Sequence, residues 1–262
     1  MTQLPAFIEQ GQGSVAVLLL HGIGGGKSVW REALPALAAA GLRAAAMDFP
    51  GYGDSSGQPD MDSMVGAVAA LVETLGAERT VIVGHSMGGM VAQELVARQP
   101  GRVQGWVQGL VLACTSASFG KSDGAWQAKF VAERLAPLDA GLGMAGMARQ
   151  LVPAMVAPMA SEASREASVA VMSRVPEASY RIALRAIAAF DRREALARIA
   201  VPTLCLAAVY DRTAPPEVLQ RMAQRIPGAE YECLADAGHI ANVEQPAAFN
   251  AAVVSFVQRH FA

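Results

Sequence analysis

One short stretch of the sequence places a hydroxyl group between small residues: Gly84-His85-Ser86-Met87-Gly88. It directly follows the apolar run "VIV" and directly precedes a helical pattern over residues 87–98. In that context a G-x-S-x-G pentapeptide forms a sharp strand-to-helix turn that strains the serine backbone and exposes its Oγ at the carboxyl end of a sheet. We therefore predict that Ser86 is a nucleophile.

A serine hydroxyl needs a general base to react at neutral pH. His239, in "DAGHIANVEQP", lies on a loop after the last predicted strand and is the histidine placed to reach Ser86. His21 ends a strand beside a glycine loop and is predicted to be structural. His85 neighbours Ser86 on a tight turn, where adjacent side chains point apart, and His260 is expected in solvent on the final helix.

The base in turn needs a carboxylate that orients its imidazole. Asp211 ends the run "LCLAAVYD", and the ends of parallel strands converge on one edge of a sheet. Asp236, three residues before His239, and Asp123 are the weaker candidates. The predicted catalytic residues are therefore Ser86, Asp211 and His239, in that order along the chain.

The glycine loop "HGIGGGKS", residues 21–28, looks at first like a phosphate-binding loop. A P-loop requires glycine five positions before Gly26, where the chain has His21, and the dinucleotide pattern requires glycine where the chain has Lys27. Glycines at this place still allow backbone N–H groups to approach a ligand and to stabilise a developing negative charge. We therefore predict an oxyanion-binding loop.

The elements that would position these residues are short, continuously apolar runs, which are typical of strands covered on both faces. Helical patterns over 87–98, 216–226 and 246–260 alternate with them. This order predicts an α/β fold with a mostly parallel, doubly wound sheet. The predicted strands are 15–22, 43–51, 80–86, 110–116, 202–211 and, more weakly, 231–239.

Residues 117–195 break this alternation. The segment is rich in alanine and methionine and has helical spacing interrupted by prolines, so we expect several short helices inserted between two strands. Its pliable methionines suit an adaptable apolar wall, although a helical core explains them equally well. The predicted organisation is a core of residues 1–116 and 196–262 with an insert of residues 117–195.

From about residue 14 onwards the chain resembles serine hydrolases of the α/β-hydrolase fold. The resemblance rests on "HGIGGG", "DFPGYGDSS", "GHSMGG", "YDRTAPP" and "AGHIANVEQP", and it is greatest toward the 3-oxoadipate enol-lactonase and small carboxylesterase branch. It implies that the amides of Ile23 and Met87 form the oxyanion hole and that residues 117–195 are a helical cap. The candidate substrate-binding residues are Gly22, His85, Trp126, Phe130 and Ile240.

The function implied by the resemblance is hydrolysis of a carboxylic ester or lactone through an acyl-enzyme. An enol-lactone with a free carboxylate would need a cation under the cap, for which Lys129, Arg134 and Arg149 are candidates. Carbon–carbon bond hydrolases usually carry Asn before the nucleophile and Trp after the histidine, where this chain has His85 and Ile240. Cofactor-free perhydrolases or haloperoxidases, a ligand-binding receptor with this fold, and a Rossmann-type oxidoreductase stay open as alternatives, whereas Ser86 excludes a haloalkane dehalogenase.

Composition limits the partners. The 262 residues have a formal net charge of −2 and no run of like charges, so neither nucleic acid nor a membrane is expected as a partner. The first residues lack the basic and apolar regions of a signal peptide, and the three cysteines are unclustered, which favours a cytoplasmic protein with reduced thiols. We expect a small-molecule ester or lactone as substrate, no metal and no cofactor, and the oligomeric state is left open.

Overall fold

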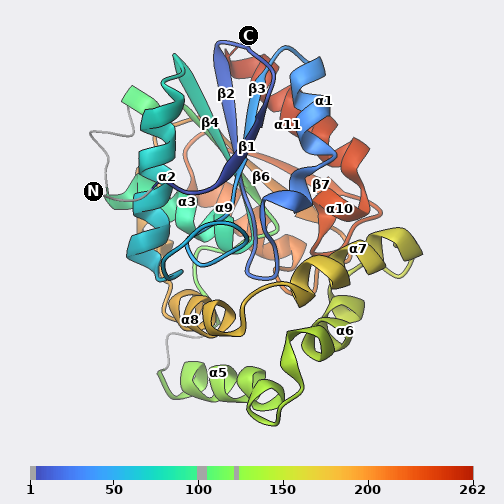
Figure 1. The fold of residues 1–262 in the computed structure, drawn as a ribbon. Helices are drawn as coiled ribbons and strands as arrows, with labels where there is room; N and C mark the ends of the chain where they lie inside the picture. Colours follow the sequence, from blue (N-terminus) through green and yellow to red (C-terminus); the bar gives the residue numbers. More distant parts are fainter. Residues whose placement is uncertain (1–3, 99–104, 121–123, 262) are drawn as a thin grey trace.

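The computed structural model describes residues 4–98, 105–120 and 124–261. Its centre is a seven-stranded sheet with the order β1-β3-β2-β4-β5-β6-β7, in which only β1 runs antiparallel to its neighbour (Figure 1). The α/β fold with a mostly parallel sheet is therefore confirmed. The strands are β1 Phe7–Gln10, β2 Val15–Leu20, β3 Arg43–Met47, β4 Arg79–His85, β5 Gly109–Ala113, β6 Thr203–Ala208 and β7 Glu230–Leu234.

The central strands are apolar because both faces of the sheet are covered. In β2 every residue is buried, and successive side chains enter two different hydrophobic clusters: Leu18 and Leu20 on one face, Val17 and Leu19 on the other. Period-two alternation between two cores explains why the strand has no polar face. The strand ends at Leu20, and the glycine loop begins at His21.

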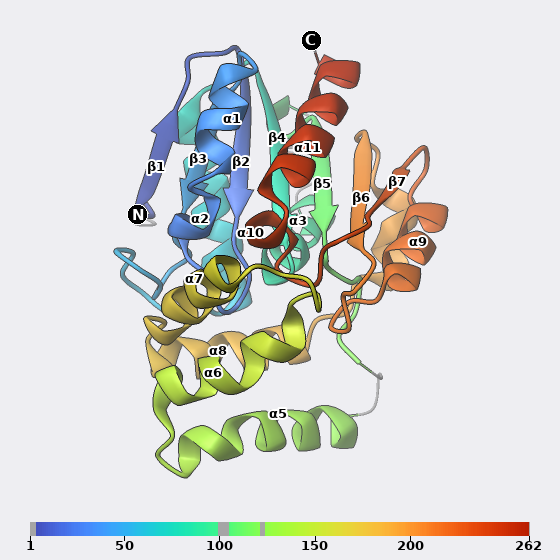
Figure 2. The ribbon, with the colours of Figure 1, turned by 90° about the vertical axis from the view of Figure 1, so that its right-hand side faces the viewer.

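Helices cover both faces of the sheet, as Figures 1 and 2 show from two sides. The helices α1 and α11 pack on one face and α2, α3 and α9 on the other. Asp60 caps the start of α2 by accepting a hydrogen bond from the Ser63 amide at 2.9 Å, and Gly76 ends this helix in the left-handed conformation. The bounds of these helices are α1 Ala33–Ala39, α2 Met61–Leu75, α3 Met87–Arg98, α9 Pro216–Arg225 and α11 Pro246–Phe261.

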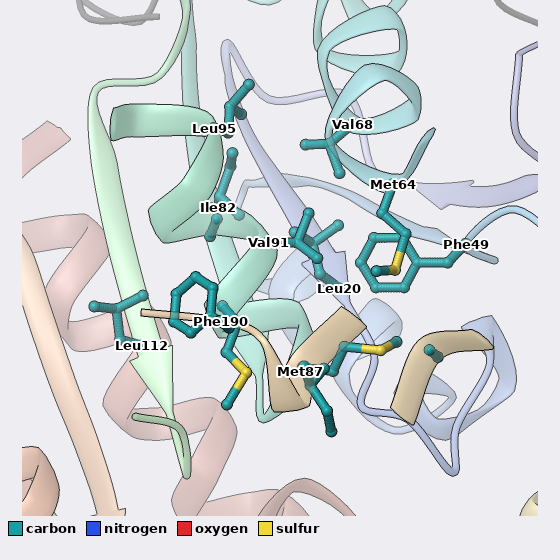
Figure 3. Close-up of a cluster of buried hydrophobic side chains, with 14 of the residues drawn as sticks. Leu20, Phe49, Met64, Val68, Ile82, Met87, Val91, Leu95, Leu112 and Phe190 are labelled. Atoms are coloured by element: carbon teal, nitrogen blue, oxygen red, sulfur yellow. The ribbon is translucent and has the colours of Figure 1, made fainter. Parts of the chain in front are cut away.

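The helix α3 is fixed by the core between the sheet and α2 (Figure 3). The side chain of Met87, its first residue, is buried in the same cluster as Val91 and Leu95. The start of α3 therefore cannot shift without disturbing this core. Figure 3 also shows Leu20, Phe49, Met64, Val68, Ile82, Leu112 and Phe190 in the cluster.

Four helices lie between β5 and β6 and cover the carboxyl ends of the strands, with α5 farthest from the sheet (Figure 2). They are α5 Gly124–Asp139, α6 Gly143–Met155, α7 Glu162–Ser173 and α8 Glu177–Ala188, and the short 3-10 helix η2 Arg193–Arg198 leads back to β6. The domain limits at 117 and 195 stay a prediction. Across the described residues, every helix is too short or too polar to traverse a lipid bilayer.

Candidate active site

Ser86 occupies the turn between β4 and α3 with a φ of 52°, which is unusual for a residue other than glycine. The turn fits because its flanking residues have no side chains: a Cβ on Gly84 would lie 2.5 Å from the Gly88 carbonyl oxygen, and one on Gly88 would lie 2.4 Å from that of Leu20. Thr115 Oγ1 donates to the Ser86 carbonyl oxygen at 2.7 Å. The strained backbone is thus held from several sides.

Replacing Gly88 by alanine is expected to lower the free energy of unfolding by about 3 kcal/mol, because the new methyl group overlaps the backbone of β2 rather than a movable side chain. Urea denaturation of the purified variant measures this. Gly124→Ala is the matched control, since no atom of the described residues lies within 4 Å of its added Cβ, and its unfolding free energy should stay within about 0.5 kcal/mol of wild type. Equal stability of the two variants would contradict the predicted overlap.

Folding brings Ser86, His239 and Asp211 into one hydrogen-bonded chain. His239 Nε2 lies 3.0 Å from Ser86 Oγ, and His239 Nδ1 lies 2.9 Å from Asp211 Oδ2. The carboxylate fixes the proton on Nδ1, so the lone pair of Nε2 faces the serine hydroxyl. Asp211 and His239 are buried, whereas Ser86 is partly exposed. This arrangement can remove the hydroxyl proton as the oxygen attacks an electrophile.

The second oxygen of Asp211 is also fully engaged. Asp211 Oδ1 accepts hydrogen bonds from the amides of Thr213 and Ala214, both at 2.8 Å. These two donors leave only Oδ2 for the imidazole and hold the carboxylate plane. Asp236 is exposed, and the bond it receives from Gln245 ends on its backbone carbonyl oxygen at 3.1 Å. Asp123, the other sequence candidate, lies outside the described residues.

The remaining histidines have different surroundings. His21 Nδ1 donates to the Gly22 carbonyl oxygen at 2.8 Å and its Nε2 accepts from the Phe49 amide at 3.1 Å, while burial lowers its pKa to about 4. Burial also lowers the pKa of His85 to about 3, and its Nε2 donates to the His239 carbonyl oxygen at 2.6 Å. Both are neutral near pH 7. His260 pairs with Glu230 on the surface of α11.

The lysine of the glycine loop is occupied by two carboxylates. Lys27 Nζ pairs with Asp48 and Asp54, and the Lys27 amide donates to Asp48 Oδ1 at 2.7 Å. Tyr52 Oη donates to the Ile23 carbonyl oxygen at 3.1 Å. The loop is thus braced from outside, and the lysine holds its shape instead of binding a phosphate.

A cavity of about 330 Å³ opens beside Ser86. Ile23, His85 and Ile240 line it, as do Gly22 and His239. Because Met87 begins α3, its amide is one of those at a helix start with no intrahelical acceptor. Ile23 lines the cavity and Met87 directly follows Ser86, and their role as oxyanion donors stays a prediction.

The two aromatic residues predicted to bind substrate are not among the residues that line this cavity. Trp126 and Phe130 lie on α5, the helix farthest from the sheet, and their rings stack on each other with a centroid distance of 5.5 Å beside Phe119. Their contact with substrate stays a prediction, since aromatic content alone does not show which inserted helix faces the site. In the structure their rings pack against each other and against Phe119.

The predicted cations under the cap are also elsewhere. Lys129 is exposed and pairs with Glu133, Arg134 lies over the Phe130 ring, and Arg149 is exposed on α6. None of the three lines the cavity. The arginines that do line it are Arg31, which follows the 3-10 helix η1 Lys27–Trp30, and Arg174, which ends α7.

The insert forms one wall of the cavity, and the sequence alone did not predict which of its residues lie there. Of the methionines in residues 141–164, Met155 lines the cavity, Met144 and Met147 are buried in the insert, and Met159 is exposed. Their abundance was compatible with an apolar wall and equally with a helical core, and the packing of α6 and α7 selects the residues that form each. The others from the insert include Val152, Val171 and Met172.

Comparisons with known proteins agree with this geometry. The family model described as "Alpha/beta hydrolase family" matches residues 17–252. A protein of Variovorax paradoxus named "Putative carbamate hydrolase RutD" is 32% identical over 252 residues, covering 93% of this chain and 92% of that one.

Two solved structures have a similar fold. The crystal structure of "Putative non-heme bromoperoxidase BpoC" from Mycobacterium tuberculosis has a TM-score of 0.84 at 28% identity and covers 100% of this chain and 98% of that one. The enol-lactonase from Burkholderia xenovorans has a TM-score of 0.83 at 25% identity, with 97% and 96% covered. The chain therefore belongs to the alpha/beta hydrolase family.

Proposed function

We propose that this protein hydrolyses a small carboxylic ester or lactone through an acyl-enzyme on Ser86. The observation that carries the proposal is the continuous hydrogen-bonded chain from Asp211 through His239 to Ser86, ending at a cavity under the inserted helices. Family membership supports hydrolysis as the reaction class. The carboxylic substrate follows from the chemistry of an activated serine beside amide donors.

In the first half of the reaction, Ser86 Oγ attacks the substrate carbonyl carbon while His239 Nε2 takes the hydroxyl proton. The imidazolium that forms is stabilised by the Asp211 carboxylate, which keeps Nδ1 protonated. The negative charge on the substrate oxygen is met by the Ile23 and Met87 amides. Each such donor is worth about 2.7–4 kcal/mol to the transition state in related chemistry.

In the second half, the imidazolium gives its proton to the leaving alkoxide oxygen, and the acyl group stays on Ser86. Water then attacks the acyl carbonyl with His239 again as base, which releases the acid and restores the hydroxyl. For a lactone the leaving oxygen stays in the same molecule, so one hydroxy acid (or its keto tautomer, for an enol-lactone) is released.

The cavity favours a small substrate. Its volume of about 330 Å³ lies near the lower end for ligand pockets, which span roughly 300–1,000 Å³. Valine, isoleucine and methionine side chains form much of its lining. A short acyl chain or a small ring therefore fits better than a long-chain lipid.

We also propose that the substrate carries a carboxylate. Arg31 from the core and Arg174 from the insert both line the cavity, and neither guanidinium has an ion-pair partner in the described part of the chain. Glu32 is the carboxylate beside them in the lining. Both residues are exposed, and two arginines in the lining favour an anionic group on the substrate, as in an enol-lactone with a free carboxylate.

Replacing Arg174 by alanine is expected to raise KM for p-nitrophenyl hemisuccinate by up to about 5-fold, since ~1 kcal/mol is the upper end for an exposed ion pair. KM for the neutral p-nitrophenyl butyrate should change less than 2-fold, because that ester carries no charge to lose. Steady-state kinetics of both esters measure the difference. Arg149→Ala, on the exposed face of α6, is the control, and an equal effect of Arg174→Ala on both esters would contradict an anion contact.

The experiment that tests the function as a whole is a hydrolysis panel of short and long esters, aryl esters, simple lactones and a carboxylate-bearing enol-lactone, with Ser86→Ala as the blank. An enol-lactone that reacts no faster than p-nitrophenyl acetate leaves the general esterase and removes the lactonase. Because one relative bears the name bromoperoxidase, a further arm adds hydrogen peroxide, acetate and bromide. Binding of these compounds without turnover would favour the receptor instead.

A further inference from the structure

A buried carboxylate beside the catalytic histidine has no part in the reaction described above. Glu244 ends the short helix α10 Ala241–Glu244 and is only 7% exposed. Its Oε2 accepts from the amides of Gly238 at 3.0 Å and Ala157 at 2.7 Å, and its Oε1 accepts from the amide of Ile240 at 3.0 Å. The carboxylate thus holds the residues on both sides of His239 and one residue of the insert.

The insert meets the histidine loop backbone to backbone at this place. The His239 amide donates to the Met155 carbonyl oxygen at 2.7 Å. A Cβ on Gly238 would lie 2.6 Å from both that oxygen and the Ala157 nitrogen, so no side chain fits between the two segments. From the other side, Arg165 donates to the carbonyl oxygens of Ala157 and Pro158, both at 3.0 Å.

Three backbone donors converging on one carboxylate match its ionised form, since a carboxylate has only acceptors to offer them. Burial raises the pKa of Glu244, while these N–H groups oppose that effect. Leaving any of the three amides unpaired would carry the cost of a buried unsatisfied donor. The Glu244 carboxylate therefore links two backbone segments by hydrogen bonds: the turn after α6 and the loop that carries His239. We call this link the joint.

We propose that Glu244 is a positioning residue that makes the orientation of the His239 imidazole depend on how the insert is seated. The proposal rests on the proposed function, because it assigns His239 as the base. Met155 connects the substrate cavity with the histidine loop, since it lines the cavity and its carbonyl oxygen accepts a hydrogen bond from the His239 amide. A displacement of about 1 Å at a reacting group can cost about 100-fold in rate, so a loosened joint should be visible in kcat.

Glu244→Gln tests the joint with little change in volume. If the glutamine NH2 group takes the place of Oε1, it faces the Ile240 amide. If it takes the place of Oε2, it faces the amides of Gly238 and Ala157, so in either orientation at least one N–H loses its acceptor. We expect kcat for p-nitrophenyl acetate to fall 10- to 100-fold, with KM changed less than about 2-fold. Rates are expressed per active site titrated with a phosphonate ester, which removes unfolded protein from the comparison.

Gln245→Ala is the matched control on the neighbouring residue. It removes one loop hydrogen bond, to the Asp236 carbonyl oxygen, without touching the insert, and should stay within about 2-fold of wild type. A second variant, Gly238→Ala, pushes the insert away from the histidine loop and should reproduce the kcat loss. If Glu244→Gln does not fold at the assay temperature, the kcat of Gly238→Ala tests the positioning role in its place.

A substrate-independent readout separates this proposal from the proposed function. In protein with 15N-labelled histidine, the Nδ1 proton of His239 hydrogen-bonded to Asp211 should give a downfield resonance in wild type and Gln245→Ala. We expect it to broaden or disappear in Glu244→Gln. Unchanged kcat per titrated site, an unchanged resonance, or an equal loss in Gln245→Ala would overturn the positioning role. Wild-type protein that keeps the resonance but hydrolyses no ester would instead overturn the function.

Discussion

Ser86→Ala is expected to lower kcat for p-nitrophenyl acetate by about 10⁶-fold, the loss seen when the nucleophile of a comparable serine enzyme is removed. The reason is that the substitution removes the attacking oxygen: His239 Nε2 lies 3.0 Å from Ser86 Oγ, and the bond to the substrate forms at that oxygen. Stopped-flow kinetics of wild type should show a burst of p-nitrophenol, which the variant lacks.

The fold should tolerate this change. Ser86 accepts its φ of 52° because Thr115 and the amides of Gly89 and Met90 hold its carbonyl oxygen, and alanine keeps that carbonyl. The midpoint of thermal unfolding should therefore stay within about 2 °C of wild type. Residual activity within 10-fold of wild type in a folded Ser86→Ala protein would remove the serine from the mechanism.

Asp211→Asn is expected to lower kcat by about 10⁴-fold, as the equivalent change does in other serine triads. The structure gives a specific reason. The amides of Thr213 and Ala214 both donate to Oδ1, so they select the carbonyl oxygen of an asparagine at that place. Its NH2 group then faces His239 Nδ1, which must give up its proton and place it on Nε2. The base then presents a proton to Ser86 in place of a lone pair.

The control for this change is Asp236→Asn, which alters an exposed carboxylate on the same side of the sheet and should leave kcat within about 2-fold of wild type. Steady-state kinetics at constant pH compare the two variants, and burst amplitudes report the fraction of working sites. Equal losses in both would mean that net charge, and not the contact with His239, controls the rate.

The sheet and the hydrogen-bonded chain were predictable because their signals are local. A strand buried on both faces gives a continuous apolar run, so the predicted strands overlap β2 to β7. The turn at Ser86 is encoded in five adjacent residues, of which Gly84 and Gly88 leave no room for a Cβ, since one would lie 2.5 or 2.4 Å from a backbone oxygen. Chain order and the geometry of parallel strands then selected Asp211 and His239.

The parts that escaped prediction depend on packing between distant segments. The helix α2 was not predicted, although Asp60 and Gly76 are ordinary signals for its start and its end. Trp126 and Phe130 meet locally, four residues apart on α5, but which way that face of the helix turns depends on how the insert packs. Glu244 gains its role only when Ala157 arrives from 87 positions away in the sequence.

The most direct test of the account is mass spectrometry of the acyl-enzyme. Wild-type protein is quenched in acid during the burst with p-nitrophenyl acetate and digested, and the peptide that contains Ser86 is examined. We predict an acetyl group on Ser86 at close to one per active site, which is absent in Ser86→Ala and accumulates slowly in Asp211→Asn. Wild-type protein that turns over the ester while Ser86 stays unmodified at every quench time would contradict it.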